Sequence, residues 1–220
     1  MKKLFILLSL WGAVLTAQAQ RTVESINKEY QNAVEYFAMM SDSFPGEGIP
    51  PEYYHLHVSH NLPGTGVHTE DIRMHYNEIE PEEDEDHYVI YLPHYLRYAT
   101  TKFNYAAREF YEEYFYDEKG QVMFIYAITP DVGEWVTPYE LRLWFDGERL
   151  LRFQAKKYDG QPDYLDIEYL RNGKFKETYS GTTIPEMYQD EVKRCQSHAQ
   201  GILTMFKHIE DCTYITDANY

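Results

Sequence analysis

The chain has 220 residues, and 36 Asp and Glu against 20 Lys and Arg give it a formal net charge of −16 at pH 7. A surface this acidic repels phosphate groups, so we expect neither a nucleic acid nor an anionic membrane as a partner. The two cysteines, Cys195 and Cys212, have no CxxC spacing, which excludes a disulfide-built scaffold, a zinc finger and a CxxC redox protein.

The first 19 residues have the pattern of a bacterial signal peptide. Two lysines precede an apolar run over residues 4–15, and Ala17-Gln18-Ala19 supplies the small residues that a signal peptidase reads. The run is too short for a transmembrane helix, which needs about 20 apolar residues, and no Cys stands at the cleavage point. We therefore expect a signal peptide over residues 1–19 and a single α+β domain over residues 20–220. That domain should be periplasmic or extracellular, should not be a lipoprotein, and should not insert into a membrane after cleavage.

The segment after the signal peptide is predicted to be a helix. Thr22 can cap its first turn, and Phe44-Pro45-Gly46 ends it. Residues 48–51 then indicate an extended linker, because each proline disfavours helix in the residue before it. The apolar positions recur at three- and four-residue steps, as one face of a helix requires: Val23, Ile26, Tyr30, Ala33, Val34 and Phe37.

From Tyr53 the apolar period changes to two, which predicts strands on both sides of a turn at residues 62–66. The apolar residues of the two strands must share one face, so we expect Leu56 to pair with Ile72. This register sets His57 opposite Asp71 and His55 opposite Arg73. Seven acids between residues 78 and 86 indicate a solvated loop, and strand-like runs follow at residues 87–92 and 94–101.

Three turns with glycine predict hairpins in the second half of the chain. Residues 103–114 fit either a helix or a strand, and we favour a strand from about residue 109. Asp117 to Gly120 joins strands ending at Tyr116 and beginning at Val122. Asp146-Gly147 and Asn172-Gly173 suit two-residue type I′ turns, in which both central residues have positive φ. The expected flanking strands are residues 141–145 and 149–153, then 165–170 and 175–179.

Pro185 is expected to open a C-terminal helix. Its apolar face runs without a break past Gly201, so we predict one continuous helix. Seventeen residues of helix would hold Cys195 and Cys212 about 25 Å apart, too far for a disulfide, and both should be free thiols. The apolar face consists of Val192, Cys195, Ala199, Ile202, Leu203, Phe206 and Ile209.

Together these elements predict an α+β fold with an N-terminal helix, a long antiparallel β-meander and a C-terminal helix packed on the sheet. The stretch Tyr95–Phe153 reads YLRYATTKFNYAAREFYEEYFYDEKGQVMFIYA and later ELRLWFDGERLLRF. It resembles a group of uncharacterised exported bacterial proteins with a Tyr-rich antiparallel hairpin meander. The resemblance covers about a quarter of the chain. It implies a sheet built from hairpins and no activity, so no functional residue is carried over.

Metal binding is the first chemistry that the histidines suggest. His55-x-His57 points two imidazoles to one face of a strand, and a divalent transition metal could use them with a carboxylate. The predicted register places Arg73 beside His55, however, and a cation is disfavoured there, so we expect no metal site. Further histidines on the same hairpin are His60, His68 and His75. The acidic run 78–86 lacks the spacing and glycine of a calcium loop.

No catalytic, cofactor-binding or metal-binding residue is assigned from the sequence. It holds no Gly-x-Ser-x-Gly elbow and no Cys/His signature of a cysteine protease, and we expect no cofactor. The aromatics that could stack on a sugar ring are Tyr53, Tyr111, Trp135 and Trp144, although each is more readily explained as core.

The composition and the export signal together favour a non-enzymatic binding module of the cell envelope, with a glycan or another envelope protein as its partner. The alternative is a small secreted hydrolase that uses carboxylates brought together by the fold. A third interpretation is a structural partner inside an envelope complex.

Overall fold

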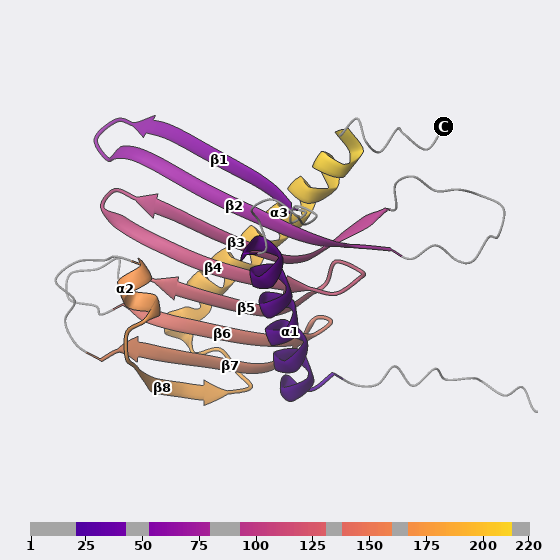
Figure 1. Ribbon diagram of the computed structural model, residues 1–220. Coiled ribbons are helices and arrows are strands. Elements are labelled where there is room, and N and C mark those ends of the chain that lie inside the picture. Colours follow the sequence, from indigo (N-terminus) through magenta and orange to yellow (C-terminus); the bar gives the residue numbers. More distant parts are fainter. Residues whose placement is uncertain (1–20, 43–52, 80–92, 131–137, 160–166, 213–220) are drawn as a thin grey trace, which may run out of the picture.

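The computed structural model describes residues 21–42, 53–79, 93–130, 138–159 and 167–212. Eight strands form one antiparallel sheet in which the spatial order β1 to β8 is the chain order. In Figure 1, α1 crosses one face of the sheet and α3 crosses the other. The strands are β1 (Tyr53–Leu62), β2 (Gly66–Glu78), β3 (His94–Tyr105), β4 (Arg108–Tyr116), β5 (Val122–Thr129), β6 (Tyr139–Asp146), β7 (Arg149–Tyr158) and β8 (Phe175–Gly181). The helices are α1 (Val23–Asp42), α2 (Ile167–Arg171), the 3-10 turn η1 (Glu186–Tyr188) and α3 (Gln189–Cys212). The predicted fold class is thus confirmed.

The first helix and the first hairpin form as the sequence predicts. Thr22 caps α1, because the backbone N–H of Ser25 donates to the Thr22 hydroxyl at 3.1 Å. In the β1–β2 pair, Leu56 lies opposite Ile72 and His57 opposite Asp71. The register prediction is therefore confirmed. The signal peptide, the linker at residues 48–51, the acidic loop beyond Ile79 and the run at residues 87–92 lie outside the described residues.

The ambiguous stretch 103–114 belongs to two strands of a hairpin. β3 extends to Tyr105 and β4 begins at Arg108, so the strand interpretation is confirmed and the helical one is wrong. Ala106 makes the reversal with a φ of +54°. The apolar spacing that imitates a helix here arises because the sheet buries side chains on both of its faces.

The Asp146-Gly147 turn differs from the prediction by one residue. Asp146 pairs with Arg149, so the loop residues are Gly147 and Glu148. Of these, Gly147 has a positive φ, +60°, and Glu148 does not. A positive φ at the first loop residue is the pattern of a type II′ turn, not the predicted type I′.

The predicted strand at residues 165–170 and its Asn172-Gly173 turn are wrong. Residues 167–171 form α2, whose C-terminal turn is closed by the N–H of Gly173 donating to Leu170 at 2.9 Å. Neither Asn172 nor Gly173 has a positive φ. A glycine is nevertheless required, because a Cβ at Gly173 would lie 2.2 Å from Cε2 of Tyr158. The sequence predicted a strand here because apolar and polar residues alternate over this short segment.

The C-terminal helix is continuous through Gly201, as predicted. Cys195 is a buried free thiol and Cys212 an exposed one. The core on the α3 face includes six residues of the predicted stripe and the inward side chains of β2 to β7. The core on the opposite face joins Val23, Ile26 and Phe37 of α1 to residues such as Phe115, Phe124 and Trp144. In the part of the chain described, no helix is long and apolar enough to cross a membrane.

Candidate functional site

Two adjacent glutamates on the central strand β4 are fully buried. Because neighbours on a strand point to opposite faces, Glu112 lies under α3 and Glu113 under α1 and α2. Their exposed fractions are 0% and 1%. A buried carboxylate is very costly unless it is paired and hydrogen-bonded, so each of them organises a polar cluster.

The cluster around Glu112 is an ion network with a histidine at its centre. His198 Nδ1 lies 2.7 Å from Oε2 of Glu112, and its Nε2 lies 3.0 Å from Oε1 of Glu70. An imidazole can donate from both nitrogens only when it is protonated. Burial opposes that charge, but the hydrogen bonds to Glu112 and Glu70 outweigh burial and raise the pKa of His198 to about 9.

A second cation, Arg194, completes this network one helical turn before His198. Its Nη2 donates to Glu112 and, at 2.6 Å, to Glu191. Glu191 in turn accepts from the hydroxyl of Thr129 at 2.7 Å. Spacings of three and four residues on α3 place these side chains on one flank of the helix. The network therefore ties α3 to β2, β4 and β5.

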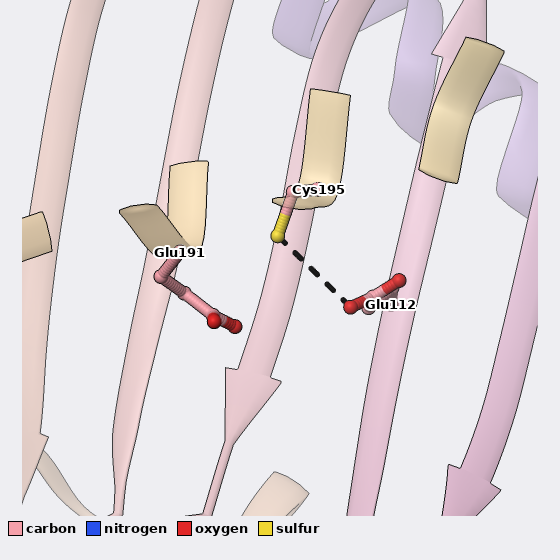
Figure 2. Close-up of side chains that lie close together, drawn as sticks. All are labelled: Glu112, Glu191 and Cys195. Carbon is pink, nitrogen blue, oxygen red and sulfur yellow. Dashed lines mark hydrogen bonds between the residues drawn. The ribbon is translucent and has the colours of Figure 1, made fainter. Parts of the chain in front are cut away.

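Glu112, Glu191 and Cys195 also approach one another closely enough to share a metal ion, since their ligand atoms lie within 4.8 Å. Figure 2 shows these three side chains converging between α3 and β4. The Arg194 guanidinium already lies among them, however, 3.6 Å from Sγ of Cys195. Burial, followed by the charge of Glu112, raises the pKa of the Cys195 thiol and keeps it protonated. The charges of Glu112 and Glu191 are therefore balanced by arginine.

The ionisable groups of this network are held in their charged forms near neutral pH. A general acid or base works best when its pKa lies near the operating pH, and His198 is locked as a cation. Its hydrogen bond is the main cause that lowers the pKa of Glu70. For Glu112, burial alone would raise the pKa. The His198 hydrogen bond and the Arg194 charge have the larger combined effect, so the pKa of Glu112 lies below its ordinary value.

On the other face, Glu113 is held by phenols and one guanidinium. Tyr30 of α1 and, at 2.7 Å, Tyr98 of β3 donate to its Oε2. Arg171, at the end of α2, donates to Oε1 at 3.2 Å and stacks 4.9 Å above the ring of Tyr111. Glu113 thus fixes both α1 and α2 to the sheet.

Beside α2 the surface is hollowed into an open pocket of about 510 Å³. Its aromatic wall is formed by Tyr158 and Tyr169, whose ring centroids lie 6.1 Å apart. Tyr169 is 51% exposed. The lining is Tyr158, Asp159, Glu168, Tyr169, Asn172, Gly173 and Lys174.

Several polar groups in this pocket have no hydrogen-bond partner among the described residues. Asn172 donates its side-chain N–H to the carbonyl of Glu168 at 2.9 Å, which leaves its Oδ1 without a partner among the described residues. The same holds for the Asp159 carboxylate and the Lys174 ammonium; these two residues meet through a backbone hydrogen bond of 2.7 Å. The pocket therefore combines an aromatic wall with donors and acceptors open to solvent.

The aromatics proposed for sugar stacking are dispersed. Trp144 is buried and donates to Asn27 at 2.7 Å, and Tyr111 lies under Arg171. Tyr53 is 37% exposed at the edge strand β1. Trp135 lies outside the described residues. Sequence reasoning missed Tyr158 and Tyr169, because they meet only through the unpredicted helix α2.

The histidines of the β1–β2 hairpin lie on both of its faces. His55 and His57 contact Asp71 on the α1 side, while His60 and His68 are paired on the α3 side with ring centroids 6.3 Å apart. His75 is buried between Phe37 and Tyr98.

Sequence reasoning also missed Glu70, Glu112, Glu113, Arg194 and His198. A usable signal was the acid pair inside the aromatic run Phe110–Tyr116, since such a strand should be buried on both faces.

Comparison of the chain with protein-family models, curated proteins and solved structures found no match.

Proposed function

We propose that this chain is an exported, non-enzymatic binding module of the cell envelope, and that it holds a neutral glycan in the pocket beside α2. The observation that carries the proposal is one hollow that combines the exposed ring of Tyr169 and the half-buried ring of Tyr158 with polar side chains that have no partner among the described residues. Sugar rings present apolar C–H faces that stack on aromatic rings, and hydroxyls that bond to carboxylate, amide and ammonium groups. A concave site with a few converging polar groups is also the general form of a small-ligand site.

The charge of the pocket indicates what kind of glycan fits. Asp159 and Glu168 outweigh Lys174, and the whole chain carries a formal charge of −16. An acidic polysaccharide would be repelled by this field. Neutral hexoses, which need hydrogen-bond partners and no counter-ion, match the lining better. The export signal predicted over residues 1–19 supports a place outside the cytoplasm, where such glycans occur.

The proposal is tested by glycan-array screening, followed by calorimetric titration of the best neutral oligosaccharide. Tyr169→Ala should weaken binding about tenfold, because losing one stacked ring costs about 1–1.5 kcal/mol. Tyr105→Ala is the matched control, since Tyr105 and Tyr169 are both 51% exposed and Tyr105 lies outside the pocket.

Two results would contradict the proposal. One is a screen in which no neutral glycan binds, and the other is equal affinity for Tyr169→Ala and the wild type. Release of reducing ends from a bound oligosaccharide would instead support the hydrolase alternative.

A further inference from the structure

One polar surface of the β1–β2 hairpin brings together two imidazoles and a carboxylate that neither the core nor the glycan pocket uses. His55, His57 and Asp71 lie on the α1-facing side of the hairpin. Their side chains are 40%, 55% and 44% exposed. A solute can therefore reach all three groups.

The two rings converge on a single oxygen atom. His55 Nε2 lies 3.1 Å from Oδ1 of Asp71, and His57 Nδ1 lies 2.9 Å from the same Oδ1. The ligand atoms of a tetrahedral zinc ion, with bonds of about 2.0–2.1 Å, lie roughly 3.3 Å from one another. Two of the three ligand–ligand distances are thus close to those of a coordination sphere. The hydrogen bonds with His57 and His55 also lower the pKa of Asp71, so it is a carboxylate.

Two cations neighbour this oxygen, and among the described residues neither forms an ion pair with it. Arg73 is directly opposite His55, as the register predicts. It has no hydrogen bond or ion pair with Asp71 among the described residues. Lys102, opposite Asp71 on β3, pairs with Glu109 at 3.5 Å. The Asp71 carboxylate is therefore engaged by the two imidazoles and, among the described residues, by no Lys or Arg.

We infer that His55, His57 and Asp71 form a surface site for a divalent transition metal such as Zn²⁺ or Cu²⁺. Two imidazoles and one carboxylate are ligands that these ions accept, and Ca²⁺ and Mg²⁺ prefer oxygen alone. The acidic field of the chain attracts cations to the site. The site lies on β1 and β2, at the opposite edge of the sheet from the glycan pocket, and does not depend on that proposal.

Binding requires one local adjustment. The nitrogens of His55 and His57 each lie close to Oδ1 of Asp71, but they lie more than 4.8 Å from each other. Among the described residues, the only group whose ligand atoms all lie within 4.8 Å is Glu112, Glu191 and Cys195. One exposed imidazole must therefore turn about its side-chain torsions so that both nitrogens face the same side of Oδ1. Rotation of exposed side chains is fast and meets little resistance, and the metal then replaces the two hydrogen bonds.

The test is a calorimetric titration of the metal-free chain with Zn²⁺ at pH 7.5. We expect one equivalent to bind, and His57→Ala, His55→Ala and Asp71→Asn each to weaken binding by tenfold or more. His60→Ala is the matched control, because His60 lies on the same hairpin and points to the opposite face. Its affinity should equal that of the wild type. Circular dichroism checks that each variant is folded.

A second readout uses the wild-type chain alone. Electron paramagnetic resonance of one added equivalent of Cu²⁺ should show coupling to two imidazole nitrogens. The inference is overturned if Zn²⁺ does not bind, if the His55→Ala/His57→Ala double variant binds as tightly as the wild type, or if the copper spectrum shows no nitrogen coupling.

Discussion

Two histidines, one half-buried and one buried, show how the same side chain acquires opposite electrostatic roles. His198 has a carboxylate at each ring nitrogen and is held as a cation. His75 lies among the rings of Phe37, Tyr53 and Tyr98, and its Nδ1 has no hydrogen-bond partner among the described residues. Burial, followed by the charge of Arg73, lowers the pKa of His75 to about 4. The two residues therefore make stability depend on pH in opposite directions.

Stability should fall as the pH rises through the titration of His198. Its pKa is about 9 in the folded state against an ordinary value of 6.5, so between these pH values only the folded state keeps the proton. The stabilising contribution is complete below pH 6.5. It should decrease by roughly 3 kcal/mol between pH 6 and pH 9. Urea denaturation at both pH values should show this slope in the wild type and a much flatter one in His198→Gln; equal slopes would contradict the charged state assigned to His198.

Stability should also fall as the pH drops through the titration of His75. With a folded pKa of about 4 and an ordinary value of 6.5, the unfolded state binds the proton first, so stability is complete above pH 6.5 and lost below it. His75→Phe removes this proton and the unpartnered nitrogen while keeping an aromatic ring in the slot. The unfolding free energy of His75→Phe relative to the wild type should be higher at pH 5 than at pH 8 by roughly 2 kcal/mol. His60→Phe, exposed on the same hairpin, serves as control, and a gain independent of pH would contradict the assignment.

At the scale of elements, glycines decide where the chain turns and where it does not. Gly120 closes the β4–β5 hairpin with a φ of +76°, and Leu203 of α3 packs against it. Gly201, by contrast, lies on the exposed side of α3 with open space around it. The first glycine is required by its conformation, and the second interrupts nothing because the apolar stripe of α3 holds the helix on the sheet.

Alanine should therefore have opposite effects at these two positions. Gly201→Ala should raise the unfolding free energy by about 0.8–1 kcal/mol, the difference in helix propensity. Gly120→Ala should lower it by about 1–2 kcal/mol, because a Cβ is unfavourable at positive φ and would lie 3.1 Å from Cδ2 of Leu203. Thermal melts of the two variants measure both effects. Destabilisation by Gly201→Ala would indicate that the helix is not continuous there.

At the scale of the whole molecule, local patterns predicted the architecture and long-range proximity produced the sites. The period of two, the turn glycines and the α3 stripe each act over a few residues, so the meander and its register could be predicted. The strand prediction at residues 165–170 was wrong because an alternation over so few residues does not distinguish a helical turn from a strand. His198 meets Glu112 and Glu70 across 86 and 128 residues of chain. No local spacing encodes such a meeting, although the buried acid pair of β4 indicates that partners must exist.

The two helices should differ in how easily they leave the sheet. Of the described residues, α1 buries Val23, Ile26 and Phe37, whereas α3 buries six side chains and carries the His198–Glu112 network. Elements with fewer buried contacts open at lower free energy than the global unfolding. Hydrogen exchange followed by mass spectrometry should therefore show the amides of α1 exchanging before those of α3 and β4. Phe37→Ala should accelerate exchange in α1 and leave exchange in α3 unchanged. Ala38→Gly, at an exposed position of α1, is the control, because it changes helix propensity without removing a buried side chain. Simultaneous exchange of α1 and α3 would mean that the sheet and both helices unfold as one unit.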